Sequence, residues 1–254
     1  MNAGFICFAD SWGLRLLRPF AADCVGVVVD PSRVDPAEAA SLLERKAPVL
    51  THPRRDGRGE MEADILSLAP ALGVIASYSR ILWPEVLTRF PLGVINLHGG
   101  PLPAYRGANV LQWAIINGET STAATLHYVD SGIDTGPVIA ASRVPIALAD
   151  SAVDVQGRLT VASAALLTEW LPRAMAGRVP ASPQPESAAR TWPRRRPEDG
   201  CIDWSWPDER IYNLVRALVA PWPGARYLDR DGQWVVVKSM LSLDDIATLR
   251  RTLT

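Results

Sequence analysis

Residues 94–107 read Val94-Ile95-Asn96-Leu97-His98-Gly99-Gly100-Pro101-Leu102-Pro103-Ala104-Tyr105-Arg106-Gly107, an apolar strand that runs into a glycine-rich turn. Side chains alternate between the two faces of a strand, so Asn96 and His98 point the same way. The Gly-Gly-Pro turn leaves that face at an open edge of the predicted sheet. An amide and an imidazole are therefore presented side by side.

A second apolar strand ends in a loop punctuated by glycines, His127-Tyr128-Val129-Asp130-Ser131-Gly132-Ile133-Asp134-Thr135-Gly136. This loop can bring the carboxylate of Asp134 to the same edge. Together, Asn96, His98 and Asp134 would supply an oxyanion donor, a general acid or base, and an acid that orients it. Each of these residues alone is more often structural. Their conjunction predicts catalysis.

Strands alternate with helices through the first half of the chain. This order predicts an α/β fold with a Rossmann-like, mostly parallel sheet. The predicted strands span 4–9, 24–29, 72–77, 92–98, 122–130 and 137–146. The predicted helices span 83–90, 108–117 and 151–176, and a further helix begins at Pro36 with Asp35 as its N-cap.

The composition changes after residue 177, because residues 178–200 hold five prolines and no apolar periodicity. We predict a catalytic domain over 1–177, a linker over 178–200 and a small C-terminal α+β subdomain over 201–254. A helix at 207–219 and a hairpin around Asp231-Gly232 are expected in the subdomain. The basic run Arg194-Arg195-Arg196 favours a solvated linker segment over a phosphate clamp.

The composition limits the classes of function and substrate that fit the chain. The chain has 254 residues, 48% of them hydrophobic, and a formal net charge of −1. This near-neutral balance favours a small-molecule substrate over nucleic acid. The three cysteines lack metal-site spacing, so no metal is expected. Met1-Asn2-Ala3 opens no signal peptide and no apolar run is long enough for a membrane span, so we expect a cytoplasmic protein. A homodimer is left open.

The first strand leads into Asp10-Ser11-Trp12-Gly13, where a dinucleotide site would need three spaced glycines. Only Gly13 is present, and we predict no NAD.

The two polar segments resemble the formyltransferases that use 10-formyltetrahydrofolate. An Asn-x-His strand, a Leu-Pro-x-Tyr-Arg-Gly turn and an Asp-x-Gly-x-Asp-x-Gly loop occur in the family's order within residues 70–145. The resemblance implies formyl transfer to a primary amine, with Asn96, His98 and Asp134 catalytic. It also implies that backbone groups of two segments hold the folate, namely Arg80-Ile81-Leu82 and Asp130-Ser131-Gly132-Ile133-Asp134.

The tail resembles the start of the C-terminal domain of methionyl-tRNA and sugar-nucleotide formyltransferases, through Pro197-Glu198-Asp199-Gly200 and Pro221-Trp222-Pro223-Gly224. Too few residues follow the second motif for the tRNA-binding barrel, so the favoured acceptor is a nucleotide-linked amino sugar. An amino acid or a hydroxyornithine-like natural-product amine remains an alternative, and methionyl-tRNA a weaker one. A non-catalytic folate-binding protein is the alternative of another class.

Three residues after the catalytic strand are expected to contact the substrate. Trp113 could stack on a substrate ring, Arg106 could bind an acidic group or brace the loop, and Tyr105 could also pack beneath the loop. His127 is expected to be a partly buried strand residue, and its approach to the substrate pocket is left open. His52 is expected at the surface.

Overall fold

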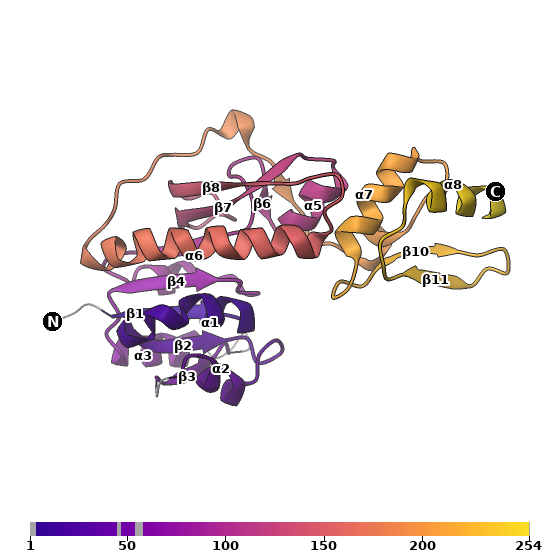
Figure 1. The fold of residues 1–254 in the computed structure, drawn as a ribbon. Helices are drawn as coiled ribbons and strands as arrows, with labels where there is room; N and C mark the ends of the chain where they lie inside the picture. The colour runs from indigo at the N-terminus through magenta and orange to yellow at the C-terminus, as the bar shows by residue number, and fades with distance from the viewer. Residues whose placement is uncertain (1–3, 45–46, 54–57, 254) are drawn as a thin grey trace. The chain divides into compact units, whose positions relative to one another are not determined.

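The computed structural model describes residues 4–44, 47–53 and 58–253, so the N-terminal tripeptide discussed above lies outside the described residues. The chain divides into two compact units (Figure 1). The first unit comprises Met1–His98, Ala124–Ser142 and Ala162–Ser187. The second comprises Gly99–Ala123, Arg143–Val161 and Ala188–Thr254. The units cross the predicted boundaries at 177 and 200, which therefore stay a prediction.

A seven-stranded sheet has the order β3-β2-β1-β4-β5-β7-β8. The strands are β1 Phe5–Ala9, β2 Cys24–Val29, β3 Val49–Thr51, β4 Leu72–Ala76, β5 Val94–His98, β7 Ser121–Tyr128 and β8 Val138–Pro145. The pairs from β3 to β5 are parallel, and β5 pairs with β7 in antiparallel register. The predicted Rossmann-like, mostly parallel sheet is confirmed.

The core of the first unit explains its continuous apolar strands. All five residues of β1 are buried, as expected where both faces of a parallel sheet are covered. Ile6 and Phe8 share one face and belong to a cluster with Ile65 of α3 and Val86 of α4. The helices of this unit are α1 Ser11–Leu17, α2 Pro36–Leu42, α3 Arg58–Ser67 and α4 Pro84–Leu87. The 3-10 helix Arg18–Asp23 follows α1.

Two aspartates begin helices in the first unit. The side chain of Asp35 accepts hydrogen bonds from the backbone N–H groups of Ala37 and Glu38, which confirms it as the N-cap of α2. Asp10 caps α1 in the same way. One turn later, a Cβ on Gly13 would lie 2.0 Å from the carbonyl oxygen of Ala76, so glycine lets α1 approach β4 closely.

The second unit contains short strands and helices. The pair β6 Arg106–Gly107 and β9 Thr191–Trp192 is parallel, and the pair β10 Ala225–Leu228 and β11 Trp234–Val237 forms the predicted hairpin. Its helices are α5 Val110–Ile116, α7 Asp208–Leu218 and α8 Leu243–Leu253, and a 3-10 turn spans Pro197–Gly200. A second 3-10 turn, Glu186–Ala188, has residues in both units. Helix α6, Ala152–Ala176, has residues in both units.

His52 is partly buried, where the sequence predicted a surface residue. Its Nδ1 lies 2.7 Å from the hydroxyl of Tyr78, and its ring stacks on Trp83 with 5.0 Å between ring centroids. These two aromatic rings cover the imidazole at the end of β3. Burial consequently lowers the pKa of His52 below its usual value.

Within the described part of the chain, none of the helices combines the length and apolar character needed to cross a membrane.

Candidate active site

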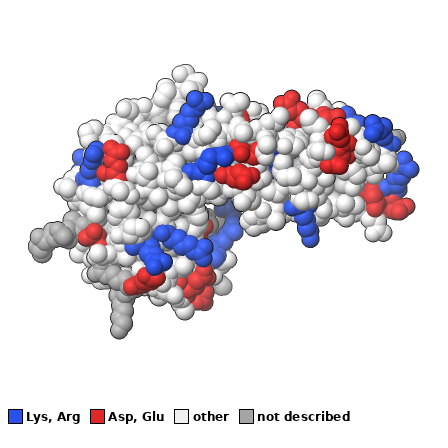
Figure 2. All heavy atoms as spheres, in the orientation of Figure 1, with Lys and Arg blue, Asp and Glu red and all other residues white. Residues whose placement is uncertain are grey.

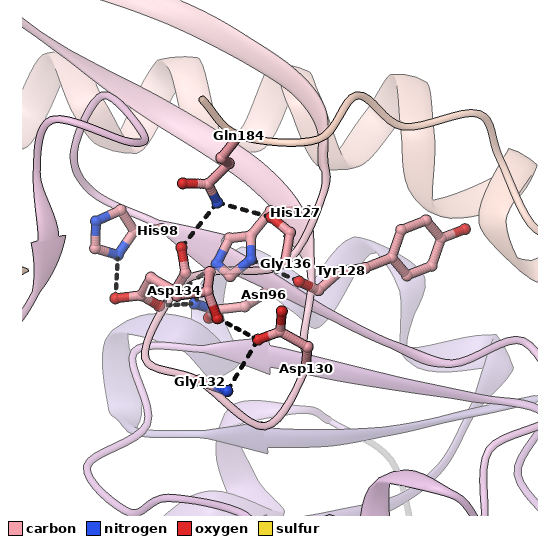
Figure 3. A network of polar contacts seen from close by, with 10 residues as sticks. Asn96, His98, His127, Tyr128, Asp130, Gly132, Asp134, Gly136 and Gln184 are labelled. Atoms are coloured by element: carbon pink, nitrogen blue, oxygen red, sulfur yellow. Dashed lines mark hydrogen bonds and ion pairs between the residues drawn. The ribbon is translucent and has the colours of Figure 1, made fainter. Parts of the chain in front are cut away.

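Two neighbouring strands and one loop place the predicted catalytic residues in the first unit (Figure 3). Strand β5 carries Asn96 and His98 at its carboxyl end. Asn96 lies opposite His127 of β7 in the antiparallel register. Because directly opposite residues of paired strands share a face, these side chains meet. The loop after β7 turns back and brings Asp134 to them.

The carboxylate of Asp134 joins the other two predicted catalytic residues. The Asn96 amide donates from Nδ2 to Oδ1 at 3.2 Å, and His98 Nδ1 lies 3.5 Å from Oδ2. The side chain of His98 is only 7% exposed and that of Asp134 14%. Partial exclusion of water strengthens such polar contacts. The structure therefore brings Asn96, His98 and Asp134 together.

His127 belongs to the same network, although the sequence favoured a partly buried strand residue and only left open an approach to the substrate pocket. Its Nδ1 lies 2.7 Å from the Tyr128 carbonyl oxygen, an atom that can only accept, so Nδ1 carries the hydrogen. In the neutral ring, Nε2 is then the acceptor for Asn96 Nδ2 at 3.0 Å, and it lies 3.5 Å from Asp134 Oδ1. The Asn96 amide is thus held between His127 and Asp134. This contact follows from the register of β5 and β7, which no sequence motif indicates.

Gln184 was also missed, because it lies in the proline-rich segment. Its Nε2 donates to the carbonyl oxygens of Asp134 at 2.8 Å and Gly136 at 2.7 Å. Near it, Ser182 pairs with Val138 of β8, and the Val179 N–H donates to the Tyr128 hydroxyl at 2.9 Å. We call residues 179–184 the strap. The strap fastens the loop that carries Asp134.

The loop after β7 is also held from within. Asp130 Oδ1 accepts from the Gly132 N–H at 3.0 Å and from Thr135 Oγ1 at 2.5 Å. A Cβ on Gly136 would lie 1.9 Å from the Tyr128 carbonyl oxygen, so the backbone closes there only with glycine. Of the predicted folate-binding residues, Asp130 therefore braces the loop. Ser131 and Gly132 are exposed, and Ile133 is 52% exposed.

The other predicted folate segment follows β4. Arg80 binds Asp30 with two hydrogen bonds, Nε to Oδ2 at 2.7 Å and Nη2 to Oδ1 at 3.1 Å. This guanidinium is the main cause that holds the pKa of Asp30 well below its usual range. Ile81 is 75% exposed, whereas Leu82 is buried in the core. The guanidinium of Arg80 is thus engaged by the protein.

The first unit contains a cavity of about 370 Å³ beside the glycine-containing loop. Its lining includes Leu87 of α4, Phe90, Val94 of β5, Asp130-Ser131 and Arg178. The guanidinium of Arg178 lies 4.9 Å from the ring centroid of Tyr128. A mostly apolar cavity with backbone groups of a loop on its wall can hold a planar ring.

The predicted substrate residues Tyr105, Arg106 and Trp113 lie in the second unit and pack there. Tyr105 stacks on Trp192 at 5.2 Å, and its hydroxyl donates to Glu119 at 2.8 Å. Burial is the main cause that raises the pKa of Tyr105 to about 12. Arg106 is 4% exposed in β6, which agrees with a brace for the loop. Their contact with a substrate stays a prediction.

Trp113 is anchored by its indole. Nε1 donates to the carbonyl oxygen of Pro193 at 2.9 Å, and its ring lies 5.4 Å from that of Trp192. The segment that begins at Pro193 is therefore tied to α5.

Comparisons with known structures agree with this architecture. A Mycobacterium tuberculosis protein inferred to be a sugar N-formyltransferase superposes with a TM-score of 0.77 at 21% identity, covering 95% of this chain and 98% of its own. An N-formyltransferase from Helicobacter canadensis, in complex with folinic acid and dTDP-3-aminofucose, gives a TM-score of 0.65 at 18% identity, with 85% and 80% coverage. HypX from Aquifex aeolicus in complex with tetrahydrofolic acid gives 0.67 at 21% identity. The alignment covers 93% of this chain but only 37% of the longer HypX chain.

At such identities these similarities establish the fold. Family membership follows from the sequence. The profile of the formyl transferase family matches residues 19–171, and the profile of the formyl transferase C-terminal domain matches residues 195–247. The first match alone spans more than half of the chain and includes Asn96, His98 and Asp134. This protein belongs to the formyl transferase family.

Proposed function

We propose that this enzyme transfers the formyl group of 10-formyltetrahydrofolate to the primary amine of a nucleotide-linked amino sugar. One observation carries the proposal. The carboxylate of Asp134 contacts Asn96 through one oxygen and His98 through the other, so the three groups required for acyl transfer share one small site.

In the proposed reaction, the acceptor amine attacks the formyl carbon. The amine loses a proton and the departing folate nitrogen gains one, and an imidazole can carry out both transfers near neutral pH. We assign this role to His98. Asp134 orients the imidazole and balances the positive charge that forms when His98 takes the proton. Asn96 donates to the oxyanion that develops on the formyl oxygen.

The hydrogen bonds of Asn96 add one requirement. Both hydrogens of Nδ2 point at acceptors of the protein, Asp134 at 3.2 Å and His127 at 3.0 Å. Donation to an oxyanion therefore requires that Asn96 exchange one of these bonds. The bond to Asp134 is the better candidate for exchange, because it is the longer of the two. The bond to His127 can stay in place, since the Tyr128 carbonyl oxygen fixes the His127 ring.

The choice of donor has two supports. The cavity of about 370 Å³ borders the loop at Asp130-Ser131, whose backbone we propose as a folate contact. The structural neighbours from Helicobacter canadensis and Aquifex aeolicus are complexes with folinic acid and tetrahydrofolic acid.

The choice of acceptor rests on the sugar N-formyltransferases among the neighbours. Figure 2 supports a small acceptor, because acidic and basic groups are interspersed among uncharged residues on the face that it shows. A protein that binds tRNA along its phosphates would favour a basic surface. A hydroxyornithine-like amine or an amino acid remains the second acceptor class.

The test is incubation with 10-formyltetrahydrofolate and a panel of acceptors, namely UDP- and dTDP-linked amino sugars, hydroxyornithine, amino acids and methionyl-tRNA. Mass spectrometry should find one added formyl group on an amino-sugar nucleotide, and absorbance should show the release of tetrahydrofolate. Formylation of methionyl-tRNA and of no other acceptor would contradict the proposal that the acceptor is a nucleotide-linked amino sugar. Folate binding without transfer to any amine would favour the non-catalytic alternative.

A further inference from the structure

The imidazole of His127 lies between the side-chain amide of Asn96 and a backbone carbonyl group (Figure 3). Its side chain is only 2% exposed. The two ring nitrogens have different partners, because Nδ1 lies 2.7 Å from the Tyr128 carbonyl oxygen and Nε2 lies 3.0 Å from Asn96 Nδ2. The proposed reaction moves no proton to or from His127. This second buried imidazole therefore has a role other than proton transfer.

The partners of the Asn96 amide decide which way it faces. A terminal amide can be rotated by 180° with little change of shape, so its hydrogen-bond partners determine the positions of its oxygen and nitrogen. Asn96 Nδ2 donates to Asp134 Oδ1 at 3.2 Å. An ionised carboxylate only accepts, so the opposite orientation would place two oxygens against each other. The same Nδ2 faces His127 Nε2, which is an acceptor only in the neutral ring with its hydrogen on Nδ1.

Two acceptors thus hold the Asn96 amide before the reaction, and one of them remains during it. In the proposed function, Asn96 gives up its bond to Asp134 in order to donate to the oxyanion. We propose that His127 is a positioning residue, whose Nε2 keeps the Asn96 amide from rotating while the Tyr128 carbonyl oxygen fixes the ring. This inference rests on the proposed function for its effect on the rate, but not for its effect on the amide.

The effect on the rate should fall on kcat. Before the oxyanion forms, the bond to Asp134 still orients the Asn96 amide, so binding of donor and acceptor does not depend on His127. In the transition state His127 Nε2 is the acceptor that holds the amide. Loss of this acceptor should therefore lower kcat and leave both KM values within about twofold of wild type.

Two amide substitutions separate the roles of the two ring nitrogens. The amide of a glutamine side chain reaches the place of Nε2 and that of asparagine the place of Nδ1, because the two side chains differ by one methylene. His127→Gln can offer Oε1 to Asn96, whereas His127→Asn keeps only a donor for the Tyr128 carbonyl oxygen. We expect His127→Gln to keep kcat within about threefold of wild type and His127→Asn to lower it about tenfold. A His127 needed only for its bond to Tyr128 would give the opposite order.

Thr122→Val is the matched control. It replaces another buried polar residue of β7 with one of similar shape, and within the part of the chain that the structure describes the Thr122 hydroxyl has no hydrogen-bond partner. Its kcat should equal that of the wild type. Thermal melts of the three variants report whether each one folds.

NMR spectroscopy tests the amide without turnover. The chain has three histidines, so comparison with His127→Gln assigns the ring nitrogens of His127 in the ¹⁵N spectrum. In the wild type near neutral pH, we expect the proton on Nδ1 and none on Nε2. Both side-chain amide protons of Asn96 should be shifted downfield by their hydrogen bonds. His127→Asn should move one of them upfield, and His127→Gln should move it less.

The outcomes separate this inference from the proposed function. A proton on Nε2 of wild-type His127 would overturn the inference, since that nitrogen could not accept from Asn96. A kcat in His127→Asn equal to or above that in His127→Gln would overturn it as well. If no amine gains a formyl group in the wild type, the proposed function fails and the Asn96 amide protons decide the inference. An upfield shift of one of them in His127→Asn supports it, and unchanged positions reject it.

Discussion

The strand end at Asp30 and the loop at Asp134 each hold a shielded carboxylate, and they stabilise it in different ways. Asp30 is 4% exposed and receives two hydrogen bonds from Arg80 and others from Ser32 and Ser79. Asp134 contacts two imidazoles and the Asn96 amide. A guanidinium keeps its charge at any ordinary pH, whereas an imidazole gains and loses protons near neutrality.

The difference separates a structural acid from a chemical one. A carboxylate beside a fixed positive charge stays ionised, and its main effect is to hold two strand ends together. A carboxylate beside an imidazole can stabilise the positive charge that appears when the imidazole gains a proton. We therefore expect changes at the Asp134 network to alter the rate, and changes at Asp30 to alter the stability.

The largest expected effect is at His98. His98→Asn should lower turnover by about 10²–10⁴-fold, the usual contribution of a general acid or base, while folate binding stays near that of the wild type. Stopped-flow or steady-state release of tetrahydrofolate gives the rate, and fluorescence titration gives the folate affinity. A variant that keeps half of the wild-type rate would remove His98 from the reaction.

Asp134→Asn sharpens the comparison between Asp134 and Asp30, because it removes the charge of the Asp134 side chain and keeps its shape. Losing a hydrogen bond to a charged group costs about 1.5–3 kcal/mol, so turnover should fall about 10–100-fold. Thermal stability should change little, since asparagine tolerates the loop conformation. Wild-type turnover in this variant would leave Asp134 as a loop residue only.

Gln184 tests whether the strap sets the position of the carboxylate. Gln184→Glu keeps the length of the side chain but removes both donated hydrogens. We expect kcat to fall about fivefold, which corresponds to one ordinary hydrogen bond of about 1 kcal/mol, with KM for the folate little changed. Gln184→Asn, which keeps the donor on a shorter side chain, should recover part of the rate. Equal rates in all three proteins would show that the strap is only structural.

The smallest effect concerns the pH dependence of stability at Asp30. Because Arg80 lowers the folded-state pKa of Asp30, the contribution of this carboxylate to stability is complete above its unfolded value of about 3.9 and is lost as the pH falls below it. The difference in urea midpoint between wild type and Asp30→Asn should thus be constant from about pH 5 to pH 7. This difference should shrink in more acidic solution. Turnover per folded molecule should not differ. A difference that grows on acidification would contradict the assigned ion pair.

Local signals predicted much of the fold. Asp35 followed by Pro36 announces a helix start that needs no tertiary context, and β2 is an uninterrupted apolar run with the predicted bounds. The pairing of Arg106 with Thr191, by contrast, joins residues far apart in sequence. The order Asn96-x-His98 predicts that these side chains share a face. It contains nothing that places His127 opposite Asn96.

The missed residues have a common cause. Gln184 and His52 take their roles from partners brought by distant segments, Asp134 and Tyr78 respectively. Neither sits in a motif, because one binds backbone carbonyls and the other a single hydroxyl. Gln184 can bind these carbonyl oxygens only because of its position in space. That position is set by the pairing of the strap with β8.

Asp134 has one feature whose consequence extends beyond the reaction. Its φ is +54°, in the left-handed region that costs most residues about 1–2 kcal/mol and glycine almost nothing. A laboratory selection for heat tolerance alone would therefore favour replacement of Asp134 by glycine. Selection for activity would act in the opposite direction at the same codon. A screen for both properties would find this position among the first where they conflict.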